Sequence, residues 1–159
     1  MTNSVTKDRL HFEDLVLGDV IELGKTHVSR EMIITFAREF DPFPFHLDET
    51  AAKASLLGGL ASSGWQTGAL SLRLLVDAFL SKVASCGGLG FKHLKWKTPV
   101  MVGDTIGGTA TIAELRRSAS HPYWGIVALD FDIRNQRGGT VLTMRLANLV
   151  ECRNAEANT

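Results

Sequence analysis

The chain has 159 residues, of which 45% are hydrophobic and 21% are charged, the composition of an ordinary globular domain. This length supplies one hydrophobic core and is short for two, so we expect a single domain over residues 1–159 with its core at about residues 12–152. Lys plus Arg and Asp plus Glu both number 17, which excludes the strong net field that attracts nucleic acid or an anionic membrane. We therefore expect neither partner.

The cysteines and the first residues bear on the compartment. Cys86 and Cys152 lie far apart and form no metal-type pair, which favours a reducing compartment without a disulfide framework. The first ten residues are polar and carry no apolar signal-peptide core. We expect a cytoplasmic protein.

Three short elements are predicted in the first third of the chain. Val20 to Val28 reads as a strand that follows a Gly-Asp turn. Ser29 is a plausible N-cap for a helix that runs to about Phe40, where Pro42 ends it. Asp48 predicts the start of a second, shorter helix, from Glu49 to about Ser55.

The longest predicted helix runs from Gly64 to about Ala84. It is apolar on nearly every side, so we expect it to be buried, and its spaced polar side chains argue against a membrane span. Arg73 and Asp77, four residues apart, predict a partly buried ion pair.

The second half of the chain is dominated by strand patterns. Apolar and polar residues alternate clearly from Gly125 to Asn135, which indicates an antiparallel sheet with one face in water. Further strands are predicted at Leu89 to Trp96, Thr105 to Leu115 and Thr140 to Glu151. One long apolar helix with about five antiparallel strands predicts an α+β domain in which a curved sheet wraps around the helix.

A candidate proton-transfer site lies between the first two predicted helices. Asp41 and His46 carry the two commonest acid/base groups, and Pro42 and Pro44 hold the segment between them in a stiff, non-helical conformation. The alternative is a proline-broken loop whose polar side chains only satisfy nearby backbone groups. The three carboxylate and imidazole groups at positions 41, 46 and 48 match no strong metal motif, so no metal is expected.

The start of the long helix is a second candidate. A helix that begins at Gly64 presents free backbone N–H groups and the positive end of the helix dipole, and Gly64 has no side chain to obstruct a carbonyl oxygen. This is the arrangement expected of an oxyanion hole. Alternatively, Ser62 or Ser63 simply caps the helix.

Three segments together resemble a known family. The run from Asp41 to Asp48 is similar to the Asp-x-Asn-Pro-x-His-x-Asp motif of MaoC-like dehydratases and (R)-specific enoyl-CoA hydratases. Ala61-Ser62-Ser63-Gly64-Trp65 resembles the start of that family's central helix, and the run from Trp96 to Asp104 resembles its later Pro-Val-x-x-Gly-Asp turn. The resemblance implies a hot-dog fold and a homodimer or higher homo-oligomer.

The resemblance also implies a reaction. Asp41 and His46 would be the acid/base pair that hydrates a trans-2-enoyl thioester to the (R)-3-hydroxyacyl thioester, or reverses this step, while the Gly64 N–H would stabilise the enolate. The substrate would be an acyl-CoA or an acyl-carrier thioester. Coenzyme A would enter as part of the substrate, with no separate cofactor.

The sequence departs from the family motif at two positions. Phe43 stands where the family has Asn, and Ser63 where it commonly has His. We interpret Ser63 as a substitute helix cap, and Phe45, Ser63 and Trp65 are the candidates for substrate contact. The aromatic residues Phe43, Phe45 and Trp65 could equally belong to the core.

Two other functions stay open. Hot-dog thioesterases usually activate water with a carboxylate on or near the central helix, and Asp77 is the only one within it here. A non-catalytic subunit that binds acyl thioesters is the second alternative, because Phe43 replaces the usual amide.

Overall fold

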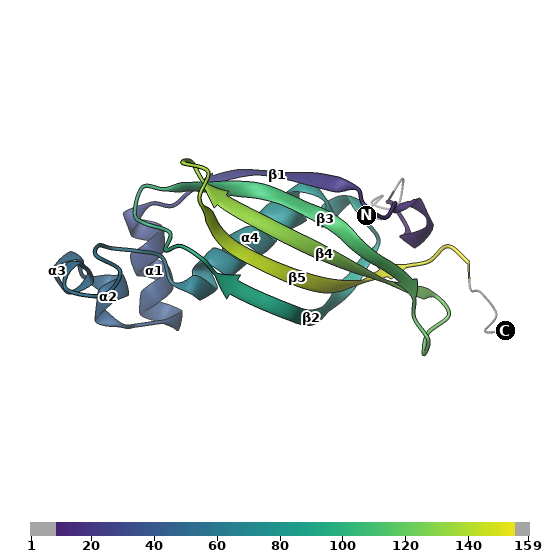
Figure 1. The fold of residues 1–159 in the computed structure, drawn as a ribbon. Helices are drawn as coiled ribbons and strands as arrows, with labels where there is room; N and C mark the ends of the chain where they lie inside the picture. Colours follow the sequence, from purple (N-terminus) through teal and green to yellow (C-terminus); the bar gives the residue numbers. More distant parts are fainter. Residues whose placement is uncertain (1–8, 155–159) are drawn as a thin grey trace, which may run out of the picture.

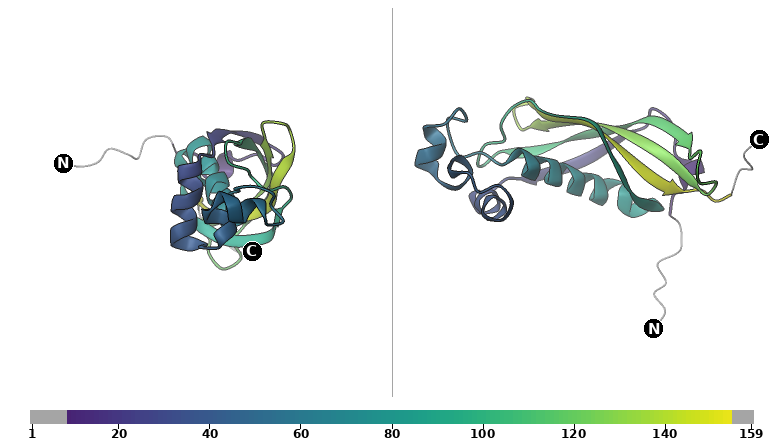
Figure 2. Two further views of the ribbon diagram at one scale, coloured as in Figure 1. Left: turned by 90° about the vertical axis from the view of Figure 1, so that its left-hand side faces the viewer. Right: turned by 90° about the horizontal axis from the view of Figure 1, so that it is seen from below.

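The structure, a computed structural model, describes residues 9–154. Five antiparallel strands form one sheet in the order β1-β3-β4-β5-β2, and the longest helix, α4, lies along one face of it (Figures 1 and 2). The strands are β1 (Val20–His27), β2 (Ser85–Trp96), β3 (Thr105–Arg117), β4 (Trp124–Asn135) and β5 (Thr140–Glu151). The predicted α+β arrangement, a curved sheet around one long helix, is confirmed.

The short helices gather at one end of the sheet, beside the N-terminal end of α4 (Figure 2). Ser29 caps the first long one, with its hydroxyl accepting a hydrogen bond from the Met32 N–H at 3.2 Å. The helices are α1 (Arg30–Phe40), α2 (Pro44–Leu47), α3 (Glu49–Lys53) and α4 (Gly64–Ala78), with single 3-10 turns η1 (Phe12–Asp14) and η2 (Leu80–Lys82).

The core lies between the sheet and α4. In the β4–β5 ladder Leu129 faces Leu146 and Phe131 faces Met144, and all four side chains are buried. Because side chains alternate between the faces of a strand, the intervening Asp130 and Asp132 lie on the outer face. The alternation in the sequence therefore predicted correctly which residues enter the core.

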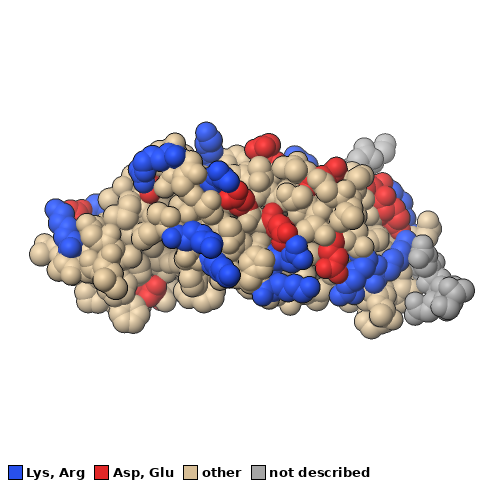
Figure 3. Space-filling view, in the orientation of Figure 1, with Lys and Arg blue, Asp and Glu red and all other residues tan. Residues whose placement is uncertain are grey.

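The outer face of the sheet carries charges of both signs, interleaved over the strands (Figure 3). Asp130 on β4 and Arg145 on β5 form a two-pronged ion pair with both N···O distances at 2.6 Å. The hydrogen bond from the Arg145 guanidinium holds the pKa of Asp130 below its usual value. Neighbouring charges thus neutralise one another on this face, in agreement with the overall charge balance.

Helix α4 is shorter and less enclosed than expected. It ends at Ala78, where Phe79 leaves the helical conformation and the 3-10 turn η2 follows. Ser71 and Leu75 are buried against the sheet, whereas Leu72 and Val76 on the opposite side are exposed. The predicted partial burial of the pair between Arg73 and Asp77 is wrong: both side chains project into solvent from this open side, 73% and 55% exposed.

The proline-framed segment also differs from expectation. Pro44–Leu47 forms one helical turn, α2, rather than a non-helical loop. Pro44 occupies the first helical position, where its missing N–H removes no helical hydrogen bond and its fixed φ suits the helix. The second proline therefore starts a helical turn that carries His46.

Two absences within residues 9–154 bear on function. None of the helices there combines the length and the apolar character needed to span a membrane. The same residues contain no group of three or more His, Cys, Asp or Glu side chains placed to hold a metal ion.

Candidate active site

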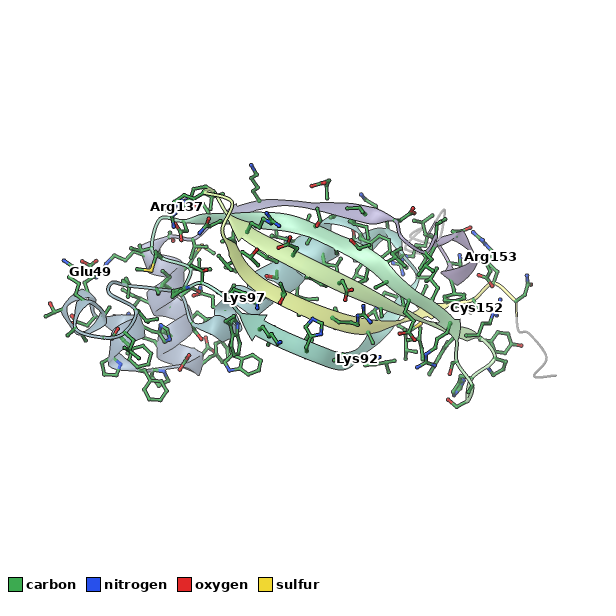
Figure 4. The ribbon with its side chains drawn as sticks, viewed as in Figure 1. Glu49, Lys92, Lys97, Arg137, Cys152 and Arg153 are labelled. Carbon is green, nitrogen blue, oxygen red and sulfur yellow. The ribbon has the colours of Figure 1, made fainter. Side chains whose placement is uncertain are left out.

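A cleft of about 280 Å³ opens where α2, the start of α4 and the end of β2 meet. Figure 4 labels Lys97 just past the end of β2, on the side of the helical end of the molecule. The cleft is lined by Phe45, His46, Leu57, Ser62, Gly64, Thr67 and the run from Trp96 to Val100. All three segments that resemble the family motifs therefore contribute residues to this one cleft, and the third does so through its first residues, Trp96 to Val100.

His46 is buried in α2, and a hydrogen bond at its Nδ1 fixes the orientation of its ring. Its Nδ1 lies 2.8 Å from the carbonyl oxygen of Ala61. Because a carbonyl oxygen only accepts hydrogen bonds, Nδ1 must carry the proton of this bond. In the neutral ring, Nε2 is then a free acceptor.

Asp41 faces that acceptor nitrogen. It is the C-cap of α1, and its carbonyl accepts a 2.8 Å hydrogen bond from the Phe43 N–H across Pro42. Its Oδ2 lies 3.6 Å from His46 Nε2, beyond ordinary hydrogen-bond length. A carboxylate oxygen and the Nε2 of a neutral imidazole both accept, so a water with two O–H donors can bridge them from one side.

The start of α4 forms another side of the cleft. Ser63 caps the helix, and its hydroxyl accepts from the Trp65 N–H at 3.3 Å. Trp96 of β2 donates its indole N–H to the Gly64 carbonyl at 2.8 Å, and its ring lies against the Gly64 Cα. No residue of the range 9–154 accepts a hydrogen bond from the Gly64 N–H. This N–H at the positive end of α4 is available to an anionic oxygen in the cleft.

The three residues proposed for substrate contact lie in different places. Phe45 lines the cleft and its ring lies edge-on to His46, 4.7 Å between centroids. Ser63 is fully buried outside the lining, with its hydroxyl 2.6 Å from Asp41 Oδ2. Trp65 is 60% exposed and borders a second, apolar hollow on the open side of α4.

Two of the three aromatic residues that could have belonged to the core lie on the surface instead. Phe43 and Trp65 are 57% and 60% exposed. Phe43 stacks on Phe45 at 5.3 Å with the rings nearly parallel, on the outside of α2. Replacement of an amide by Phe43 therefore places an exposed ring beside the cleft-lining one.

The turn from Met101 to Asp104, which ends the third motif segment, has a structural role. The buried Asp104 accepts hydrogen bonds from the Met101 N–H at 2.9 Å and from Gln136 Nε2 at 2.8 Å. The turn is thereby joined to the β4–β5 hairpin, and it directly follows the Lys97–Val100 run that lines the cleft.

Sequence reasoning missed Trp96 and Thr67 as residues of the cleft. Trp96 belongs to the third motif, but nothing in that motif indicates that its indole reaches the start of α4, 32 residues away in the chain. Thr67 lies one helical turn after Ser63 and donates to its carbonyl at 3.3 Å. A helical-wheel projection from Gly64 places Thr67 on the same side of α4.

Comparisons with known proteins agree with this arrangement. The family model described as the MaoC like domain matches residues 15–122. The (R)-specific enoyl-CoA hydratase of Rhodospirillum rubrum is 28% identical over 110 residues, covering 66% of this chain and 71% of that protein. The uncharacterized protein YdeM of Bacillus subtilis is 27% identical over 143 residues, 89% of this chain and 99% of that protein.

A solved structure extends the likeness to the whole fold. The crystal structure of a MaoC-like dehydratase from Rhodospirillum rubrum is 39% identical and superimposes with a TM-score of 0.80, over 91% of this chain and 99% of that one. The sheet wrapped around α4 is the hot-dog fold that the resemblance implied. The chain therefore belongs to the MaoC-like dehydratase domain family.

Proposed function

We propose that this protein is a hydro-lyase that adds water to a trans-2-enoyl thioester, or removes it from the (R)-3-hydroxyacyl thioester. The observation that carries the proposal is the pair Asp41 Oδ2 and His46 Nε2, which face each other at 3.6 Å, together with Gly64, which lines the same cleft as His46. The name of the Rhodospirillum rubrum relative, an (R)-specific enoyl-CoA hydratase, supports the same reaction class.

The chemistry follows from the hydrogen-bond roles of these groups. A water bound between Asp41 and His46 donates one O–H to each, so its oxygen lone pairs point away from both acceptors toward the substrate. Loss of a proton to this pair makes the oxygen a nucleophile that bonds to the β-carbon of the enoyl thioester. The π electrons move onto the carbonyl oxygen, and the proton held by the pair returns to the α-carbon. Both additions come from one face, which gives a syn hydration.

The Gly64 N–H stabilises the charge that forms during this step. The enolate oxygen carries the electron pair until the α-carbon is protonated, and a backbone N–H at a helix N-terminus is a fixed donor for it. Donors of this kind typically lower a barrier by about 3 kcal/mol, and a positioned acid/base pair contributes a further 10²- to 10⁴-fold, roughly, in rate. Coenzyme A or an acyl carrier belongs to the substrate, so the reaction needs no separate cofactor.

The thioesterase alternative finds less support. Asp77, the carboxylate it would use, is held by Arg73 in an exposed ion pair. It lies 13 residues after Gly64 on α4, about 20 Å along the axis at 1.5 Å per residue. Asp77 is therefore far from the cleft.

We also propose that the functional unit is a homodimer formed through the open side of α4 and the edge strand β2. This side carries exposed apolar side chains around a hollow of about 220 Å³ that is almost without polar atoms. These side chains include Trp65, Leu72 and Val76 on the helix and Phe91 on the strand. Apolar patches and unpaired strand edges on one face commonly mark a protein interface. Light scattering should give twice the mass of one chain.

The function is tested with crotonyl-CoA and a series of longer and branched enoyl-CoA substrates. Loss of the conjugated-thioester absorbance with formation of the (R)-3-hydroxyacyl product is expected. Thiol release is followed in the same reactions, because free thiol without hydrated product would favour the thioesterase. Acyl-CoA binding without either reaction would favour a non-catalytic subunit.

A further inference from the structure

Ser63 stands at the junction between the acid/base pair and the start of α4. Its side chain is fully buried, and its hydroxyl oxygen has two polar neighbours: Asp41 Oδ2 at 2.6 Å and the Trp65 N–H at 3.3 Å. Neither Ser63 nor Asp41 is among the residues that line the cleft. The Asp41 side chain keeps 20% of its surface exposed, whereas Ser63 is fully buried, so a substrate in the cleft does not reach the Ser63 hydroxyl.

The direction of both hydrogen bonds is determined by the groups themselves. A carboxylate only accepts and a backbone N–H only donates, while a hydroxyl has one proton and two lone pairs. The Ser63 proton must therefore point to Asp41, and a lone pair receives the Trp65 N–H. A hydroxyl that accepts from a helix N-terminus is polarised by it and becomes a stronger donor to the carboxylate.

Asp41 depends on this bond. Within residues 9–154, Ser63 is the one hydrogen-bond donor that contacts the Asp41 carboxylate, and the titratable group that faces it is His46, 3.6 Å away. The aspartate itself stands at the end of α1, just before the proline-framed turn. Without Ser63 the side chain would be free to rotate away from His46.

One short segment then orients the whole site. The Ala61 carbonyl holds His46, the Ser63 hydroxyl holds Asp41, and the next residue, Gly64, offers its N–H to the cleft. The relative placement of acid, base and oxyanion donor is set within four residues of backbone. Small errors in such placement cost large factors in rate.

We propose that Ser63 is a positioning residue that keeps the Asp41 carboxylate turned toward His46, with the start of α4 as its support. The proposal rests on the proposed hydratase function and deepens it. It also assigns a chemical reason to serine at this position: alanine offers no donor, whereas one hydroxyl receives the helix N–H and donates to the carboxylate at the same time.

The test compares Ser63→Ala and Ser63→Thr with wild type in hydration kinetics. Loss of one hydrogen bond to a charged group should lower kcat about 10- to 100-fold with little change in KM. A merely structural role would reduce the amount of folded enzyme without this split between kcat and KM. Threonine, which keeps the hydroxyl, should restore most of the rate.

Ser71→Ala is the matched control. It removes another fully buried hydroxyl from the same helix, one that donates to the Thr67 carbonyl at 2.7 Å and lies outside the cleft. Its kcat and KM should match those of wild type. A folded Ser63→Ala enzyme with the kcat of wild type would overturn the proposal.

A second readout works without any activity. Crystal structures of wild type and Ser63→Ala show whether the Asp41 carboxylate keeps its place 3.6 Å from His46 Nε2. A carboxylate rotated away from His46 in the variant supports the proposal, and an unchanged carboxylate rejects it. If wild type hydrates no substrate, the proposed function fails while this comparison still decides the role of Ser63. Should Ser63→Ala not fold, Ser63→Cys, a weak donor of similar size, replaces it.

Discussion

The close contact between Gly64 and Trp96 gives a sharp prediction for Gly64→Ala. A Cβ added at Gly64 would lie 2.6 Å from Trp96 Cε2 and 2.9 Å from its Cδ2 and Nε1. Carbon atoms in contact prefer about 3.5 to 4.0 Å, so the indole must move outward by roughly 1 Å. Its ring is held by the hydrogen bond to the Gly64 carbonyl and by an edge-to-face contact with Trp65 at 5.4 Å.

The energies of these effects oppose one another. Overpacking typically costs about 1 to 3 kcal/mol, and loss of the indole hydrogen bond costs about 1 kcal/mol. Replacing glycine in a helix returns about 0.5 to 1 kcal/mol. We expect Gly64→Ala to lower the free energy of unfolding by about 1 to 3.5 kcal/mol, measured by urea denaturation. Because the new methyl group also displaces the wall of the cleft, kcat for hydration should fall by about 10- to 100-fold.

Gly68→Ala is the control for this experiment. It makes the same chemical change one helical turn later, where an added Cβ meets no atom within 4 Å. There the helix propensity alone should act, and the variant should be more stable than wild type by about 0.5 to 1 kcal/mol. If Gly64→Ala proved as stable and as active as Gly68→Ala, the reasoning from the indole contact would be refuted.

Three further predictions test other parts of the molecule. Asp104→Ala leaves the Met101 N–H and the Gln136 amide without their buried acceptor, so the free energy of unfolding should fall by about 2 to 3 kcal/mol in urea denaturation; a loss below about 0.5 kcal/mol would show that water replaces the carboxylate. Asp130→Asn removes the pair with Arg145 and should cost about 1 kcal/mol or less at neutral pH. Because that pair lowers the pKa of Asp130, its stabilisation is present above the unfolded pKa and is lost as the pH falls through the folded one, so the wild-type advantage should vanish in acid; an advantage that persists there would contradict the assignment. Leu72→Glu, on the open side of α4, should convert the proposed dimer to monomers in light scattering, and Lys25→Glu, exposed on β1 at the opposite edge of the sheet, is its control; a monomeric wild type would reject this interface.

Much of the fold follows from the sequence because strand alternation and helix length are local signals. The alternation around Asp130 and Asp132 correctly indicated the outer face of β4. The helical turn at Pro44 was missed because proline interrupts a helix within it but is well tolerated at its first position. The open side of α4 was missed for another reason. Its apolar residues indicate burial, but they do not indicate whether residues of the same chain or of a partner chain pack against them.

The candidate site was predictable in its residue types and unpredictable in its contacts. Asp41, His46 and Gly64 stand out through their chemistry and their order along the chain. Their supports come from distant positions: Ala61 for His46 is 15 residues away, and Ser63 for Asp41 is 22 residues away. Such pairs depend on how α1, α2 and α4 pack together, which local patterns do not encode. The interpretation of Ser63 as the cap of α4 is confirmed, but the sequence did not indicate that its hydroxyl also donates to Asp41.

The central claim is that Asp41 and His46 together activate the water that is added to an enoyl thioester. The most direct measurement is kcat/KM for hydration of crotonyl-CoA by wild type, Asp41→Asn and His46→Ala, with folding of each variant checked by circular dichroism. The account predicts turnover by wild type to the (R)-3-hydroxyacyl product and a loss of about 10²- to 10⁴-fold in each variant. Variants that fold and hydrate the substrate as fast as wild type would contradict it.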